Sequence, residues 1–230
     1  MRPATLVAAM GMAAYQPLFF SGVDRVGVAV GTLLTIGSAP VFVGAIESAI
    51  TGTGPPRIWV IATITAIAGL TLLAFSQGDQ MASSIGALLA LAAGLSYAVY
   101  VVSAARLAQA IPARQSTASI FGLAAVMLLP VALTQDLSFA ASPGGAGMVL
   151  WLGLAATAAA YLLFTSGLKA TEAGAAATLT LGEPVTATLL AVWALGETPG
   201  ASGWAGIALI GAGLALAAHP ASTAIKAKHV

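Results

Sequence analysis

The segment LTLGEPV at residues 179–185 has a close match 144 to 145 positions earlier, LTIGSAPV at residues 34–41. The match extends outward from these two segments in a constant order. It pairs Ser21-Gly22 with Ser166-Gly167, Gly52 with Gly196, Pro55 with Pro199, and Gly69 with Gly213. Glycine, proline and loop positions that recur in one order at one offset predict an internal repeat, which relates residues 14–76 to residues 159–219.

Both matched segments lie inside long apolar stretches. A helix rises 1.5 Å per residue, so about 20 apolar residues cross the hydrocarbon core of a bilayer. We find eight such stretches, at residues 4–21, 28–50, 58–76, 84–104, 117–134, 147–167, 174–195 and 203–219. The whole chain is 59% apolar and 7% charged, with a mean hydropathy of +0.99. A soluble globular domain is excluded by this composition, and we predict an all-α integral membrane protein with about eight transmembrane helices.

The repeat also predicts how these spans are organised. The first three spans correspond to the last three, whereas the two spans within residues 84–134 have no counterpart in the chain. We therefore expect a partial first repeat of three helices at residues 1–76, a complete second repeat of five helices at 77–219, and a cytoplasmic tail at 220–230. This is the pattern of the last eight helices of a five-plus-five protein. An odd number of spans per repeat requires the two repeats to have opposite orientations in the membrane.

The basic residues predict the orientation of the chain. With the N-terminus inside, seven of the eight Lys and Arg residues fall on the cytoplasmic side, and Arg25 alone falls outside. This bias follows the positive-inside rule and places both termini in the cytoplasm, with the protein in the cell inner membrane. Arg2 followed by an alanine-rich stretch also resembles a signal peptide. The repeat disfavours that alternative, because it gives the first span a partner later in the chain.

Several short motifs resemble the EamA-type transporters of the drug/metabolite transporter superfamily. They are AYLLF at 160–164, TLGEPV at 180–185, LGE at 195–197, GWAG at 203–206 and GAG at 211–213. The resemblance implies ten transmembrane helices in two inverted five-helix repeats around a central cavity, and transport of small metabolites or drug-like solutes. This chain departs from that pattern because it has no equivalent of the first two helices. The alternative is a truncated or split membrane protein that does not transport.

Glu183 is the principal candidate for a functional residue. It falls near the middle of a predicted span, where a charged side chain costs roughly 2.5–3.5 kcal/mol on insertion scales. Pro184 has no N–H, so we expect the carbonyl of Thr180 to lack a helical donor and to open a polar position. Glu183 either binds a proton or solute there, or makes a structural contact at a kink. Pro40 is the repeat-related proline and is expected to kink its own span, but Ala39 stands where the other repeat has Glu183.

A second group of candidates is rich in hydroxyl groups. Ser96, Tyr97 and Tyr100 lie on one predicted helix, where positions three apart share a face. Tyr161 lies on the sixth span. In a transporter these side chains line a cavity, and in the alternative they pack helix against helix through hydroxyl hydrogen bonds. Glu47, near the cytoplasmic end of its span, is expected to lie at the membrane interface, and a role in a cavity is the less favoured alternative.

Other functions have little support in the sequence. The chain has no Cys, and its two His residues, His219 and His229, follow the last span, so we expect no metal site and no catalytic residues. The sequence contains no phosphate-binding loop of the G-x-x-x-x-G-K-[ST] kind, and its net charge of +1 gives no reason to expect nucleic acid. We predict no cofactor. The expected partners are the lipid bilayer and an unidentified small solute, and the small residues of the last span are compatible with a homodimer.

Overall fold

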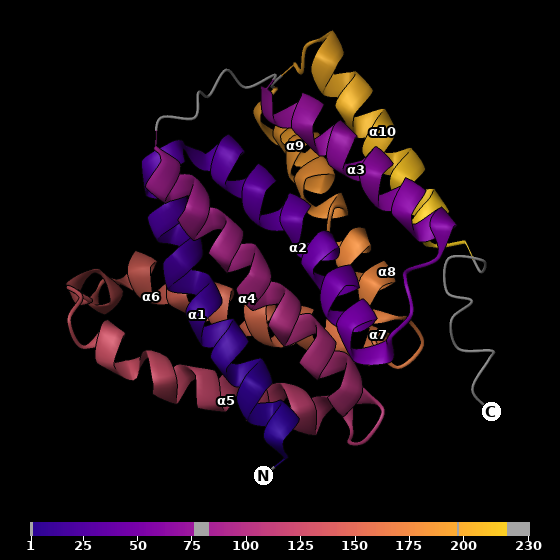
Figure 1. Ribbon diagram of the computed structural model, residues 1–230. Helices are drawn as coiled ribbons and strands as arrows, with labels where there is room; N and C mark the ends of the chain where they lie inside the picture. The colour runs from indigo at the N-terminus through magenta and orange to yellow at the C-terminus, as the bar shows by residue number, and fades with distance from the viewer. Residues whose placement is uncertain (1, 76–82, 197, 220–230) are drawn as a thin grey trace.

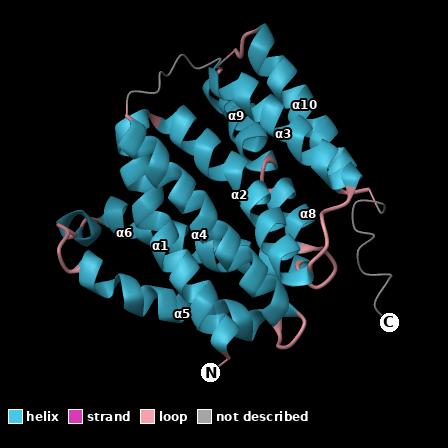
Figure 2. Cartoon of the chain, viewed as in Figure 1, coloured by secondary structure: helices cyan, strands magenta, loops and turns pink. Residues whose placement is uncertain are grey.

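The computed structural model describes residues 2–75, 83–196 and 198–219, and all of its regular secondary structure there is helical (Figures 1 and 2). The long elements are α1 (Pro3–Val26), α2 (Val28–Thr51), α3 (Arg57–Phe75), α4 (Ser84–Ala108) and α5 (Ala113–Ala132). They are followed by η1 (Ser138–Ala141), α6 (Pro143–Trp151), η2 (Leu152–Ala159), α7 (Ala160–Gly167), α8 (Ala173–Leu179), α9 (Gly182–Leu195) and α10 (Ala201–Ala217). The predicted tail at 220–230 lies outside the described residues, as does Glu197.

Seven of the eight predicted spans are confirmed as helices of a length and hydropathy suited to crossing a membrane. Seven stretches are long and apolar enough to cross a bilayer, with α6 to α7 and α8 to α9 each forming one of them. The eighth predicted span is α10, whose 17 residues are at the lower limit for a crossing. The first span was predicted to end too early, at residue 21, because α1 continues to Val26 and holds Asp24 and Arg25 in its last turn. A charged side chain is tolerated there because it is close to the end of the helix, where Arg25 Nη1 donates to the Ser21 carbonyl oxygen at 2.6 Å.

Helix α4 is the centre of one half of the bundle, and both α1 and α2 pack on it (Figure 1). The approach is close because small residues face it. A Cβ at Gly11 would lie 2.7 Å from the Ser96 carbonyl oxygen, and one at Gly94 would lie 2.7 Å from the Thr35 carbonyl oxygen. The contact is strengthened by the Thr35 hydroxyl, which donates to the Ala90 carbonyl oxygen at 3.0 Å.

Helices α3 and α10 form a second, antiparallel pair (Figure 1). A Cβ at Gly69 would lie 2.6 Å from the Gly206 carbonyl oxygen, and a Cβ at Gly213 would lie 2.7 Å from the Ala62 carbonyl oxygen. The offset of 144 that relates Gly69 to Gly213 also relates Ala62 to Gly206. The two contacts are therefore equivalent: exchanging the two repeats turns one into the other. The small face of α10 packs inside the chain, and a homodimer stays a prediction.

The helix directions bring the basic residues together. Because α1 is antiparallel to α4 and α3 is antiparallel to both α2 and α10, the start of α1 and α3 and the end of α2 and α4 share one end of the bundle. This end, called the basic end below, holds five of the six described Lys and Arg residues: Arg2, Arg57, Arg106, Arg114 and Lys169. Helices α1, α2 and α3 run opposite to their repeat counterparts α6–α7, α8–α9 and α10.

Two spans of the second half are interrupted. The span from Pro143 to Gly167 passes through the π-helical turns of η2, and the span from Ala173 to Leu195 breaks between α8 and α9. Helix α2 contains Pro40 but continues through it as one helix. The second interruption positions the candidate site.

Candidate functional site

The break between α8 and α9 falls at Thr180 and Leu181, so Glu183 is the second residue of α9. The Thr180 carbonyl lacks the α-helical donor that Pro184 cannot supply, as expected, but the open polar position predicted there does not form. That oxygen accepts the Glu183 amide at 3.0 Å, three residues further along the chain. This tighter 3₁₀-type bond replaces the α-helical bond that the missing amide of Pro184 would have made. The Thr180 hydroxyl donates back to the Ala177 carbonyl oxygen at 2.7 Å. Backbone groups at the break are thus internally bonded, and the Glu183 carboxyl group is the polar group that it presents.

Glu183 lines a small cavity in the middle of the bundle. The cavity has a volume of about 50 Å³, and residues of α1, α2, α4, α7 and the α8–α9 break surround it. Its lining consists of Tyr15, Thr35, Ile36, Tyr97, Tyr161, Thr180 and Glu183. Four residues singled out in the sequence, namely Glu183, Thr180, Tyr97 and Tyr161, therefore meet around one space.

Three of the four tyrosines of the chain line this cavity, and the fourth, Tyr100, packs behind them. The ring centroids of Tyr15 and Tyr97 are 5.5 Å apart, those of Tyr97 and Tyr100 are 5.8 Å apart, and those of Tyr100 and Tyr161 are 5.7 Å apart. These distances are in the range of favourable aromatic pairs, and Tyr100 and Tyr161 meet edge to face. Such rings give the cavity apolar walls and bring phenolic hydroxyl groups close to Glu183.

A second cavity of about 250 Å³ adjoins the first and is lined by α2, α3 and α9. It shares Ile36 and Glu183 with the tyrosine-lined cavity, and Pro184 contributes to its wall. Glu183 is exposed, whereas Thr35 on the opposite wall of the small cavity is buried. The carboxylate thus lies where the two cavities join, with part of its surface open.

The remaining predicted residues lie beside the cavity and do not line it. Tyr100 is fully buried behind Tyr97 and Tyr161, with its hydroxyl near Thr165. The backbone of Ser96 packs against Gly11 of α1, so Ser96 belongs to the α1–α4 contact.

Two lining residues, Tyr15 and Thr35, were not among the residues singled out in the sequence. Thr35 is the repeat counterpart of Thr180 at an offset of 145, so the repeat itself carried the signal that finds it. Tyr15 had a weaker signal, as one of only four tyrosines in 230 residues.

Comparison with known proteins gives the family of the chain. Residues 84–218 match the EamA-like transporter family. The chain is also 43% identical over 212 residues to the uncharacterized transporter YwfM of Bacillus subtilis (strain 168). The aligned region covers 92% of this chain and 72% of that protein. This chain belongs to the EamA-like transporter family. It is a multi-pass membrane transporter of the drug/metabolite type, as the sequence motifs predicted.

A solved structure supports the fold. A crystal structure of another protein, 22% identical in sequence, superimposes with a TM-score of 0.80 over 94% of this chain and 76% of that one. The likeness extends over nearly the whole of the described bundle and concerns the fold alone.

Proposed function

We propose that this EamA-family chain moves a small metabolite or drug-like solute across the cytoplasmic membrane by secondary transport, through the cavity that Glu183 lines. The observation that carries the proposal is the position of Glu183: at a break in a membrane span and at the junction of two cavities. Acidic residues inside membrane spans are costly, and those that occur typically face solute or ion pathways. The proposal assigns the chain no catalytic role.

The sizes of the two cavities fit a closed state around the site. The inner cavity of about 50 Å³ has room for a few water molecules, whereas pockets for organic ligands are typically 300 Å³ or more. We therefore propose that the inner cavity widens when the two halves of the bundle rock against each other, as in other inverted-repeat transporters. The adjoining cavity of about 250 Å³ is then the approach to Glu183 from the end of the bundle opposite the basic end.

We further propose that the basic end faces the cytoplasm, in the cell inner membrane. The absence of cysteine from the chain allows a direct test, because one introduced cysteine is the only target of a maleimide. In intact cells, a membrane-impermeant maleimide is expected to label an Asp136→Cys variant and to leave an Ala110→Cys variant unlabelled until the cells are opened. Labelling of the two variants in the reverse order would show the opposite orientation.

The test of the site is transport by a Glu183→Gln variant in proteoliposomes. The wild-type chain is first screened with radiolabelled cationic, zwitterionic, anionic and neutral solutes at several pH values. Loss of a charge-assisted hydrogen bond of about 1.5–3 kcal/mol corresponds to a roughly 10- to 100-fold loss of flux. Asp136→Asn is the matched control, because this exposed carboxylate lies outside the spans and bonds the Ser138 amide. Unchanged flux and unchanged pH dependence in Glu183→Gln would remove Glu183 from the mechanism.

The second candidate is a split or truncated protein that does not transport by itself. Its support is an asymmetry of packing: among described residues, α6, η2 and α9 have no buried side chain, whereas their repeat counterparts α1 and α2 pack on α4. The same proteoliposome screen separates the two candidates. If the folded wild-type chain moves none of the four solute classes, the result favours a protein that does not transport by itself.

A further inference from the structure

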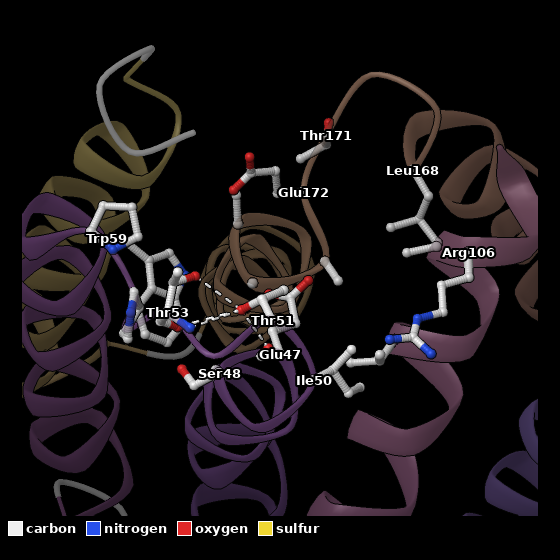
Figure 3. A pocket seen from close by; sticks show the side chains of 18 of the residues that line it. Glu47, Ser48, Ile50, Thr51, Thr53, Trp59, Arg106, Leu168, Thr171 and Glu172 are labelled. Atoms are coloured by element: carbon white, nitrogen blue, oxygen red, sulfur yellow. Dashed lines mark hydrogen bonds between the residues drawn. The ribbon is translucent and has the colours of Figure 1, made fainter. Parts of the chain in front are cut away.

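A third cavity, separate from the Glu183 site, lies at the basic end of the bundle. Its volume is about 290 Å³, and it is enclosed by the end of α2, the start of α3, the end of α4 and the segment that leads into α8. It has no lining residue in common with the two cavities at Glu183. Figure 3 shows Trp59 and Arg106 at opposite sides of this cavity, with Glu47 and Glu172 between them.

Trp59 supplies a fixed hydrogen-bond donor to this cavity. Its side chain is only 7% exposed and its ring is wedged against α2, because a Cβ at Gly44 would lie 2.6 Å from Cη2 of the indole. The indole Nε1–H is buried and makes no hydrogen bond to any residue within the described ranges. A buried tryptophan N–H normally has a partner. This one is therefore placed to donate to an acceptor that the described chain does not provide.

Glu47 places a negative charge beside that donor. A Cβ built on Gly174 would lie 3.1 Å from Nε1 of Trp59 and 3.3 Å from Oε2 of Glu47. Oε2 of Glu47 therefore lies close to Gly174, near the start of α8. The glycine thus leaves free a position that both the donor and the carboxylate can reach.

The rest of the cavity sets the size and polarity of what fits. Buried Val102 and Leu168 give it apolar walls. The charged groups that face it are Glu47, Glu172 and Arg106, so carboxylates outnumber guanidinium groups by two to one. Arg106 is exposed at the rim. The expected occupant therefore combines a cationic donor, a neutral oxygen acceptor and a short apolar body.

We propose that this cavity is a second binding site, which takes a small primary amine that carries an oxygen acceptor close to its ammonium group. The ammonium group donates to the Glu47 carboxylate, and the oxygen accepts the Nε1–H of Trp59. The methylene groups between the two occupy the position that Gly174 leaves free. The site stands at the basic end, apart from the Glu183 cavities, and binding there does not depend on the proposed role of Glu183.

The chain offers its own optical probe for this site. Trp151, Trp193 and Trp204 are exposed on the outside of the bundle, so their replacement by Phe leaves Trp59 as the single reporter. Ethanolamine is titrated into this full-length variant in nanodiscs at constant ionic strength. Two probes of nearly the same size serve as comparisons: propylamine lacks the oxygen, and 1-propanol lacks the ammonium group.

Ethanolamine is expected to change the Trp59 emission saturably, and both comparison probes are expected to bind at least about tenfold more weakly. Glu47→Gln, which keeps the shape and removes the charge, is expected to weaken ethanolamine binding by a similar factor. Gly174→Ala keeps both polar groups and places a methyl group between them, so it is expected to abolish binding. Glu183→Gln is expected to bind ethanolamine like the parent, which separates this site from the proposed transport site.

Three results would overturn the proposal. No saturable response to ethanolamine would show that the cavity holds only water. Equal binding of ethanolamine and propylamine would show a site for any cation, without a role for the Trp59 N–H. Unchanged binding by both Glu47→Gln and Gly174→Ala, each confirmed as folded by size-exclusion chromatography, would place the amine elsewhere.

Discussion

Two pairs of repeat-related spans in this molecule have diverged to very different extents. In the α3–α10 pair, Gly69 and Gly213 occupy matched positions and make matched backbone contacts with the opposite helix. In the other pair, α2 is one continuous helix with buried Ala39 and Pro40, whereas α8–α9 breaks and presents Glu183. The contrast indicates that symmetry is retained where the two repeats pack on each other and is lost where the site is built.

The second pair also shows what determines a break at proline. Both spans carry proline at the matched position, Pro40 or Pro184, yet only one is interrupted. Helix α2 is packed against α4 and α3 on both sides of its proline, with Thr35, Gly37, Val43 and Gly44 all buried. Helix α9 has no buried residue in its described part. Packing therefore holds α2 in helical geometry, and the break forms where that support ends.

The largest effect is expected from crowding the symmetric pair. Leucine at Gly213 would force atoms into the backbone of α3, where the Ala66 amide nitrogen would be 2.8 Å from the new Cβ. We expect a loss of at least about 3 kcal/mol in unfolding free energy, because backbone cannot move aside as a side chain can. Gly211→Leu on the same helix is the control, since a Cβ there meets nothing within 4 Å. Equal stability of the two variants in an SDS unfolding titration would contradict the described α3–α10 contact.

The next largest effect is expected at the matched position of α2 and α8–α9, which is Ala39 in one span and Glu183 in the other. Ala39 is 1% exposed, so Ala39→Glu buries a carboxyl group without a partner and is expected to cost about 1–3 kcal/mol. Glu183→Ala at the repeat-related position removes an exposed carboxylate, and we expect little change in stability. Unfolding titrations of both variants measure the difference. Similar costs at the two positions would mean that the two spans are more alike than described.

A smaller effect is expected from the two prolines. Pro184→Ala supplies an amide that can bond the Thr180 carbonyl in α-helical register, in competition with the Glu183 amide. We expect slower hydrogen exchange at residues 180–184 and a severalfold lower flux, because Glu183 is turned from its present position. Pro40→Ala is expected to leave both unchanged. The account of the break fails if Pro184→Ala alters neither exchange nor flux.

The smallest effect on stability is expected from removing the hydrogen bond that joins α3 to α8. The hydroxyl groups of Thr63 on α3 and Thr178 on α8 are buried and lie 3.0 Å apart. Thr63→Val is expected to lower the unfolding free energy by about 1 kcal/mol, the usual net value of one hydrogen bond. Ser119→Ala is a suitable control, because the hydroxyl of this half-buried residue bonds only to the Gln115 carbonyl oxygen, within its own helix. A double-mutant cycle with Thr178→Val that shows no coupling would remove the link.

Sequence reasoning was sufficient for the fold because hydropathy alone determines which segments cross a membrane. It misplaced the end of α1, since Asp24 and Arg25 look like loop residues although the last turn of a membrane helix tolerates them. At the site, Glu183 was evident because an acid within an apolar span is costly. Tyr15 was not evident, because its approach to Tyr97 depends on how α1 packs on α4. Ser96 was grouped with Tyr97, although adjacent residues on a helix point in different directions.

The central claim is that the water-accessible site lies at the α8–α9 break and not at the matched position of α2. It is tested most directly by cysteine accessibility in the otherwise cysteine-free chain, with Glu183→Cys and Ala39→Cys compared in proteoliposomes. The account predicts that a water-soluble methanethiosulfonate reagent modifies the Glu183→Cys variant and leaves the Ala39→Cys variant unmodified until the protein is unfolded. Modification of Ala39→Cys at the same rate as Glu183→Cys, or protection of Glu183→Cys, would contradict it.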